Sequence, residues 1–136
     1  MYRKTEGNPE QRSVLDYVLN IIDKEDNSLD SKCIYLDGMG GTGKTFVYEA
    51  LTHLFNSRIK KVKNSASTGI AATLLPKGTT AYKTFGLNVN LDPRKRPTKK
   101  LAEDLADTDA FQWDEAPMSN NLLFEIADEV LVSFFN

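Results

Sequence analysis

The residues from Gly38 to Thr45 have the types and spacing of a loop that binds nucleotide phosphates. They read Gly-Met-Gly-Gly-Thr-Gly-Lys-Thr and match the pattern G-x-x-x-x-G-K-[ST] at every fixed position. Backbone N–H groups can converge on a triphosphate only where no side chain intrudes and where the chain can adopt a positive φ, so glycine suits such a loop. The candidate nucleotide-binding residues are Gly38, Gly40, Gly41, Thr42, Gly43, Lys44 and Thr45.

Two of these residues have specific chemical roles in the pattern. Lys44 is expected to reach the β- and γ-phosphates as a point charge, and Thr45 to give its hydroxyl to Mg²⁺. A helix that starts near Lys44 would point its unpaired N–H groups and its positive dipole end at the phosphates. The motif therefore predicts nucleotide binding, and a flexible glycine loop without a ligand is the alternative.

Asp114 and Glu115 are the candidate acidic residues for hydrolysis. They follow a short apolar run, Ala110–Trp113, that is typical of a strand. In a phosphate-loop fold the carboxylate at such a strand end holds Mg²⁺, so we assign this role to Asp114. Glu115 could then take a proton from the attacking water as general base. A solvated surface pair is the alternative interpretation.

The elements that would position these residues alternate between helix and strand. Helices are expected from Asn8–Pro9 to about Asp23, from Lys44 to about Phe55, from Thr68 or Gly69 to Leu75, around Leu101–Ala106, and after Ser119 as the N-cap of a final helix. Buried strands are expected at Cys33–Leu36 and Ala110–Trp113, with a weaker one near Arg58–Lys63. Gln112 is unusual in a buried strand and requires either a short strand or a polar partner. This order predicts an α/β fold around a mostly parallel sheet.

The composition excludes several classes of protein. Of the 136 residues 40% are hydrophobic and 26% are charged, which are ordinary values for one globular domain. Cys33 is the single cysteine and His53 the single histidine, so an internal disulfide framework and a multi-histidine metal site are excluded. No apolar run approaches the ~18 residues of a membrane helix, and the first residues lack the apolar region of a secretory signal. We therefore expect no membrane association, and the net charge of −2 is no global signature of nucleic-acid binding.

The motifs together resemble one helicase family. The chain is similar to the petite-integration-frequency (PIF-type) DNA helicases of superfamily one, which are RecD-like and include the helicase domains of Helitron transposons. The block Ser-Thr-Gly-Ile-Ala-Ala and the block Trp-Asp-Glu-Ala-Pro-Met are the specific part of the resemblance. The matching stretches, in the family's order, are Asn8–Gln11, Leu36–Phe46, Ala66–Pro76, Gly78–Ala81 and Trp113–Met118.

The resemblance assigns roles that the residues alone do not. It implies that Gln11 recognises adenine, so that the nucleotide is ATP with Mg²⁺ as cofactor. It implies that Thr68 and Gly69 contact single-stranded DNA, where backbone and hydroxyl groups meet phosphates. Tyr82 stands where the family usually has histidine, and a tyrosine can still stack on a base. An exposed glutamine at position 11 and a structural turn capped by Thr68 are the alternatives.

The resemblance also implies an architecture and an activity. The fold would be an incomplete RecA-like three-layer sandwich, with residues 1–7 as a tail, residues 8–136 as part of the first motor domain and the second motor domain absent. The function would be that of an ATP-dependent 5′-to-3′ DNA helicase, with DNA repair, recombination and telomere maintenance as the family's context. We expect a monomer inside the cell, in the nucleus rather than the mitochondrion. The chain alone is expected to bind ATP–Mg²⁺, to hydrolyse it slowly and not to unwind DNA, because arginine fingers of a second domain are absent.

Several alternatives stay open at this point. A catalytically inactive nucleotide-binding remnant of a transposon helicase is the second hypothesis, and an ATPase with a protein substrate is the third. The basic residues between Arg94 and Lys100 could track a DNA backbone or form a solvated loop. Phe85 could stack on a base or pack in the core, whereas His53 is expected to be a partly exposed helix residue.

Overall fold

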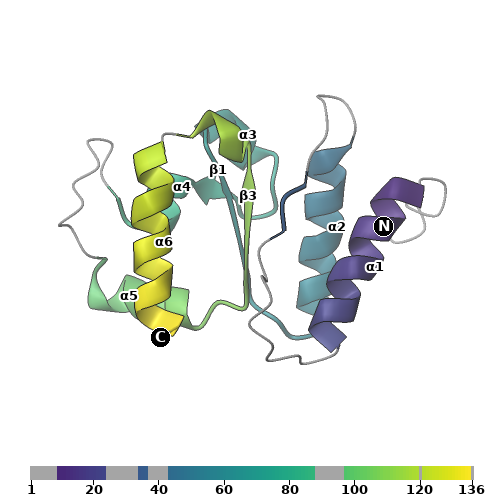
Figure 1. The fold of residues 1–136 in the computed structure, drawn as a ribbon, viewed down its shortest axis with the longest axis horizontal. Helices are drawn as coiled ribbons and strands as arrows, with labels where there is room; N and C mark the ends of the chain where they lie inside the picture. Colours follow the sequence, from purple (N-terminus) through teal and green to yellow (C-terminus); the bar gives the residue numbers. More distant parts are fainter. Residues whose placement is uncertain (1–8, 24–33, 37–42, 88–96, 120, 136) are drawn as a thin grey trace. The chain divides into compact units, whose positions relative to one another are not determined.

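The computed structural model describes residues 9–23, 34–36, 43–87, 97–119 and 121–135 (Figure 1). The chain divides into two compact units, Met1–Leu54 and Phe55–Asn136, and each is described by itself. The structure is α/β, as predicted, and the second unit contains a three-stranded parallel sheet that is compatible with an incomplete RecA-like phosphate-loop domain. No helix within the described ranges combines the length and the apolar character needed to cross a membrane.

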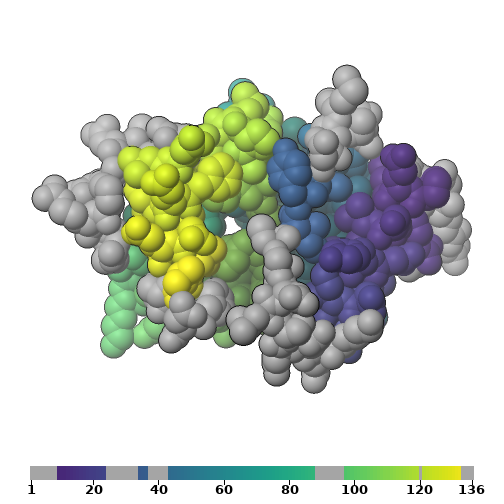
Figure 2. Space-filling view, viewed as in Figure 1, coloured from purple at the N-terminus to yellow at the C-terminus, as the bar shows by residue number. Residues whose placement is uncertain are grey.

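Two helices make up most of the described first unit, α1 (Pro9–Asp23) and α2 (Lys44–Ser57), and the last turn of α2 belongs to the second unit. Pro9 has φ preset for a first helical position, and Glu10 places a negative charge near the positive end of the helix dipole. Both helices were predicted from their apolar spacing. In Figure 2 the side chains of α1, in purple, form part of the surface of this unit. The buried apolar residues are Leu15 and Val18 in α1 and Val47, Ala50 and Leu51 in α2.

The predicted buried strand at Cys33–Leu36 is wrong for its described part. Residues 34–36 belong to none of the three strands of the sheet, and Tyr35 is 68% exposed. Cys33 lies outside the described residues.

A turn at the end of α2 separates this helix from the first strand. Lys60 N–H donates to the Phe55 carbonyl at 2.9 Å and Ile59 N–H to the Asn56 carbonyl at 3.1 Å. These two bonds define a Schellman motif, which requires a left-handed residue, and Ile59 has a φ of 57°. The strand β1 (Val62–Ala66) therefore begins after this turn, later than the basic run from Arg58 predicted.

The sheet has the order β2-β1-β3, with β2 at Thr79–Thr80 and β3 at Ala110–Asp114. Both pairings are parallel, and β1 and β3 are in register from Val62 opposite Ala110 to Ala66 opposite Asp114. The last residues of β1 and β3, Ala66 and Asp114, thus lie opposite each other at the same edge of the sheet. The residues that follow them must meet at the carboxyl edge of the sheet.

The centre of the sheet is polar, although it is buried. Gln112 Nε2 donates to Asn64 Oδ1 at 2.7 Å, and Asn64 Nδ2 donates to the Pro76 carbonyl at 3.0 Å. Ser65 Oγ donates to the Gln112 carbonyl at 3.1 Å. The expectation that Gln112 has a polar partner is confirmed, and the weak apolar pattern of β1 is explained.

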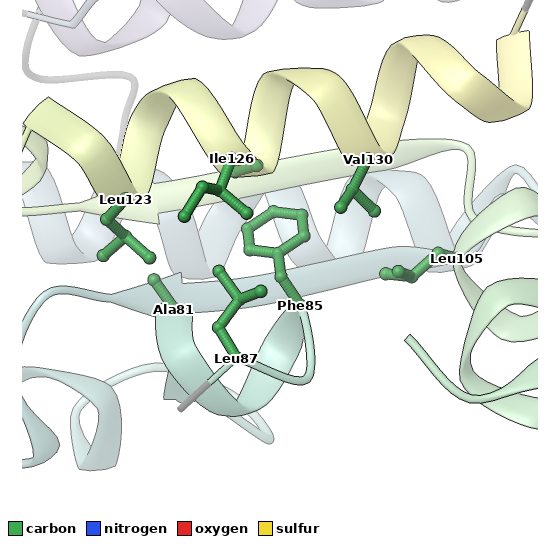
Figure 3. Close-up of a cluster of buried hydrophobic side chains, with 8 residues drawn as sticks. Ala81, Phe85, Leu87, Leu105, Leu123, Ile126 and Val130 are labelled. Atoms are coloured by element: carbon green, nitrogen blue, oxygen red, sulfur yellow. The ribbon is translucent and has the colours of Figure 1, made fainter. Parts of the chain in front are cut away.

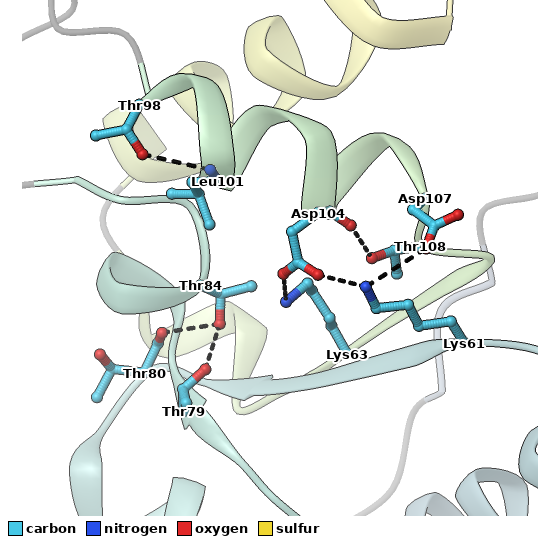
Figure 4. A network of polar contacts seen from close by, with 10 residues as sticks. All are labelled: Lys61, Lys63, Thr79, Thr80, Thr84, Thr98, Leu101, Asp104, Asp107 and Thr108. Atoms are coloured by element: carbon cyan, nitrogen blue, oxygen red, sulfur yellow. Dashed lines mark hydrogen bonds and ion pairs between the residues drawn. The ribbon is translucent and has the colours of Figure 1, made fainter.

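Threonines cap three of the helices in the second unit. Each cap hydroxyl accepts a hydrogen bond from the N–H group three residues later, which satisfies one of the unpaired donors at a helix start. Figure 4 shows this bond between Thr98 and Leu101. The helices and their caps are α3 (Gly69–Thr73) with Thr68, α4 (Ala81–Thr84) with Thr80, and α5 (Lys99–Ala106) with Thr98.

The last helix, α6 (Asn121–Phe135), follows the short 3₁₀ helix η2 (Ala116–Met118). Ser119 was predicted to cap α6, which begins at Asn121, and residue 120 lies outside the described residues. The hydroxyl of Ser119 contacts that of Ser67.

The hydrophobic core of the second unit lies between α6 and the sheet. Figure 3 shows Leu123, Ile126 and Val130 of α6 pointing toward Phe85. Phe85 is 1% exposed, and its ring centroid lies 5.8 Å from those of both Phe111 and Trp113. Phe85 is therefore a core residue, and the alternative that it stacks on a base is wrong.

A cluster of ion pairs joins α5 to the start of β1 (Figure 4). Asp104 contacts the ammonium groups of Lys61 and Lys63, the latter at 2.5 Å, and Lys61 also lies 3.7 Å from Asp107. Hydrogen bonds from Lys61 and then Lys63 hold the pKa of Asp104 below its usual range. The hydrogen bond to Asp104 correspondingly raises the pKa of Lys61.

Candidate nucleotide and DNA site

The described end of the phosphate-loop motif is the start of α2. The N–H of Val47 donates to the Gly43 carbonyl at 3.2 Å, so Gly43 precedes the helix and Lys44 and Thr45 are its first two residues. The first N–H groups of a helix have no acceptor within it, and with the dipole they favour an anion at this end. Gly43 has a φ of 85°, which a glycine adopts without cost. The other candidate loop residues, Gly38, Gly40, Gly41 and Thr42, lie outside the described residues.

Gln11 lies directly against this helix start. It occupies the first turn of α1, and a Cβ built on Gly43 would collide with its Nε2 atom. A carboxamide carries both a donor and an acceptor, which match the donor N6 and an acceptor nitrogen of adenine. The structure thus brings the residue predicted to recognise adenine together with the described end of the loop predicted to bind phosphate, within one unit.

The acidic pair lies at the carboxyl end of β3. Asp114 is the last residue of the strand and is 8% exposed, and its Oδ1 accepts a hydrogen bond from Glu115 N–H at 2.9 Å. Oδ2 has no hydrogen-bond partner in the described part of the chain. A buried carboxylate at a strand end with one oxygen available suits a hard cation such as Mg²⁺, which prefers oxygen ligands. Thr45 and Asp114 therefore have the donor types for Mg²⁺, although they belong to different units.

Glu115 is held in a conformation that non-glycine residues rarely adopt. Its φ is 55° and its ψ is 33°, in the left-handed region. Besides the bond from its N–H to Asp114, its carbonyl accepts a hydrogen bond from Ser67 Oγ at 2.6 Å. One carboxylate oxygen, Oε2, accepts from Thr68 Oγ1 at 3.2 Å. The carbonyl and the side chain of Glu115 are therefore held by residues that directly follow β1, and its N–H is held by Asp114.

Ser67 contacts three residues through one hydroxyl. It donates its single proton to the Glu115 carbonyl and accepts from Trp113 Nε1 at 3.3 Å. Its contact with the Ser119 hydroxyl must then use a proton of Ser119. Sequence reasoning did not identify Ser67 or Ser119 as site residues. The available signal was that Ser67 directly follows a strand and precedes the candidate DNA residues.

The three predicted DNA residues have different environments. Thr68 and Gly69 are exposed at the start of α3, and a Cβ added to Gly69 would meet nothing within 4 Å. This backbone is open to a ligand. Tyr82 is partly buried and packs against the core cluster of the second unit, so part of its ring is used for packing.

The remaining candidates have simpler roles. Lys99 and Lys100 are exposed in the first turn of α5, and the rest of the basic segment that starts at Arg94 lies outside the described residues except Pro97 and Thr98. His53 is exposed on α2, as expected. No group of three or more potential metal-binding His, Cys, Asp or Glu side chains occurs within the residues that the structure describes.

The structure thus assembles two partial sites. One consists of Gln11, Gly43, Lys44 and Thr45 in the first unit. The other consists of Thr68, Gly69, Asp114 and Glu115 in the second unit, at the carboxyl edge of the sheet.

Comparison with known proteins relates the chain to a helicase family and to a bacterial helicase. The sequence matches the profile of the PIF1-like helicases over residues 7–136. It is also 30% identical over 106 residues to the ATP-dependent DNA helicase Pif1 of Psychrobacter sp. (strain PRwf-1). That alignment covers 74% of this chain and 16% of the bacterial protein, so the chain spans a small part of its relative's length.

Proposed function

Because the chain belongs to the PIF1-like helicase family, we propose that it binds ATP–Mg²⁺ and single-stranded DNA as part of a 5′-to-3′ DNA helicase. The observation that supports this most directly is the level ending of β1 and β3. It places the candidate DNA residues Thr68 and Gly69 beside the candidate hydrolytic residues Asp114 and Glu115. Such proximity would allow bound DNA to act directly on the residues proposed for hydrolysis.

Each proposed role follows from the chemistry of the residue. Lys44 neutralises charge on the β- and γ-phosphates, and Gln11 reads the adenine edge. Thr45 and Asp114 hold Mg²⁺, which when bound neutralises charge on the phosphates. Glu115 accepts a proton from the water that attacks the γ-phosphorus, while the bond from that phosphorus to the leaving oxygen breaks.

Strand separation is proposed only for a larger protein. The chain corresponds to 16% of the bacterial relative, and arginines supplied from elsewhere are worth about 10³–10⁵ in rate in phosphate-loop enzymes. We therefore expect the 136-residue chain to bind ATP–Mg²⁺, to turn it over slowly and to leave duplex DNA intact. Robust unwinding by the purified chain would contradict this expectation.

The test is ATP turnover by the 136-residue chain with and without single-stranded DNA, combined with direct binding of both ligands. The proposal expects DNA to raise turnover and Lys44→Ala to abolish the increase. Lys60→Ala is the matched control, because Lys60 is exposed and lies in the turn after α2. Nucleotide binding without any turnover would support an inactive remnant instead, and turnover indifferent to DNA would support a different phosphate-loop ATPase.

A further inference from the structure

The hydroxyl of Thr68 has one proton, so it can donate a hydrogen bond to one acceptor at a time. In the structure it accepts a hydrogen bond from Ala71 N–H at 3.2 Å, which caps α3, and it donates its proton to Glu115 Oε2 at 3.2 Å. A phosphate of DNA carries only acceptor oxygens. Thr68 can therefore donate to a phosphate only if it releases Glu115.

The surroundings make this exchange possible. Thr68 is exposed, and the position of a Cβ on Gly69 is open space, so a phosphate can approach the Thr68 hydroxyl. The backbone of Glu115 would stay in place during the exchange, because Ser67 and Asp114 hold its carbonyl and its N–H. Only the carboxylate would be released.

We propose that Thr68 is a positioning residue for Glu115, and that its single hydroxyl proton is donated either to the Glu115 carboxylate or to a phosphate of single-stranded DNA. Without DNA, Thr68 holds the carboxylate of the general base. When DNA is bound, the Thr68 hydroxyl donates its hydrogen bond to the phosphate instead, and the carboxylate of Glu115 is free to turn toward the attacking water. The proposal rests on the proposed function and adds a physical link between DNA occupancy and hydrolysis.

The link is reciprocal, so it can be measured through DNA affinity alone. If Glu115 competes with DNA for the Thr68 proton, removing the carboxylate by Glu115→Ala strengthens DNA binding. Removing a negative charge near a phosphate also strengthens binding, whatever Thr68 does. The two effects separate when Glu115→Ala is measured in backgrounds in which residue 68 offers no proton, one proton or two.

Three substitutions of Thr68 provide these backgrounds. Thr68→Ser keeps one hydroxyl proton and the cap. Thr68→Val has nearly the same shape but no proton. Thr68→Asn keeps a strong helix cap through its carbonyl oxygen and offers two amide protons, so it tests the proposal even if Thr68→Val fails to fold.

The experiment is a titration of labelled single-stranded oligothymidine with the 136-residue chain at one fixed salt concentration, followed by fluorescence anisotropy. With Thr68 or Thr68→Ser, Glu115→Ala is expected to strengthen binding by about threefold to tenfold more than it does with Thr68→Val or Thr68→Asn. An equal gain in all four backgrounds would show charge repulsion alone and overturn the switch. Absence of DNA binding in every variant, the unsubstituted chain included, would overturn the proposed DNA-binding function and the switch with it.

Discussion

Single residues at this site are fixed by contacts between residues that are far apart in the sequence. Gln11 and Gly43 illustrate the point, since a side chain from one helix lies in the space that a Cβ on the glycine would occupy. The loop pattern requires glycine at position 43 for its own conformation, and the structure adds a second reason. The same glycine leaves room for the amide that is proposed to read the base.

A first prediction concerns Gln11. Gln11→Ala removes one bidentate contact to adenine, so ATP affinity should fall by about tenfold and the preference for ATP over GTP should disappear. Equilibrium binding of both nucleotides measures this. Tyr17→Ala is the control, because Tyr17 is a 57% exposed residue of the same helix. An unchanged preference for ATP would remove Gln11 from the site.

A second prediction compares two glycines. Gly69→Ala adds a methyl group into open space and should leave stability within about 0.5 kcal/mol, while DNA affinity falls because the methyl group occupies the proposed approach of a phosphate. Gly78→Ala should lower stability and leave DNA affinity unchanged. Its methyl group would collide with the Ala72 carbonyl, so we expect a loss of about 1–3 kcal/mol of stability. Thermal unfolding and anisotropy titrations distinguish the two, and a similar DNA affinity for Gly69→Ala and the unsubstituted chain would argue against contact there.

At the scale of elements, the turn after α2 has a strained residue. Ile59 takes the left-handed position of a Schellman motif although it is β-branched, and it is 94% exposed. Its side chain therefore contributes almost no packing that could offset the backbone cost. Glycine is the residue that this position favours.

A third prediction follows from this turn. Ile59→Gly should raise the free energy of unfolding by about 1 kcal/mol, since the left-handed conformation costs an L-residue about that amount. Ile70→Gly is the matched control, because Ile70 is 83% exposed but lies in the right-handed helix α3. There glycine should destabilise by about 0.5 kcal/mol, the difference in helix propensity between isoleucine and glycine. Denaturant unfolding of the two variants should give opposite signs, and the same sign in both would refute the strain at Ile59.

The elements also show what the sequence could and could not predict. The helices that begin at Pro9 and Lys44 and the strand that begins at Ala110 were predicted, because apolar spacing and capping residues are local signals, and the cap at Thr68 was given as the alternative to a DNA contact. The strand predicted at 33–36 is not found over residues 34–36, because the formation of a strand depends on a partner strand that the apolar run itself does not specify. The contact between Thr68 and Glu115 could not be predicted, since it depends on the register of β1 with β3 and on the left-handed turn at Glu115.

At the scale of the whole molecule, four charged residues form one cluster of ion pairs within the described part of the chain. The net charge is −2, so no general attraction to DNA is expected, and the Lys61 and Lys63 ammonium groups share the Asp104 carboxylate. The side chains of Lys61 and Asp104 are 40% and 38% exposed, so solvent screens their interaction. We expect each such pair to contribute no more than about 1 kcal/mol.

A fourth prediction concerns pH. The folded pKa of Asp104 is lowered, so its contribution to stability is fully present above the unfolded value of about 3.9 and is lost as the pH falls through the lower folded value. The raised pKa of Lys61 acts in the opposite direction, so its contribution is present below about 10.4 and is lost at higher pH.

Asp104→Asn should therefore cost up to about 1 kcal/mol at neutral pH and almost nothing once Asp104 is protonated in the folded chain. Denaturant unfolding between pH 2 and 7 measures the difference. Asp107→Asn is the control and should have a smaller effect, because Asp107 is 82% exposed and lies 3.7 Å from Lys61. A constant difference at every pH would mean that Asp104 acts through packing and not through its charge.

The buried amides of Asn64 and Gln112 have a consequence for how the chain finds its alignment during folding. A slip of β3 by one residue would separate the two amides and turn the following carboxylates to the other side of the sheet. In such a misaligned chain, buried polar groups would lack hydrogen-bond partners, which costs about 1–3 kcal/mol for each group. An apolar pair at these positions would accept the slip more readily. The hydrogen bond between the two amides thus favours one strand register, the register in which Glu115 lies next to Thr68.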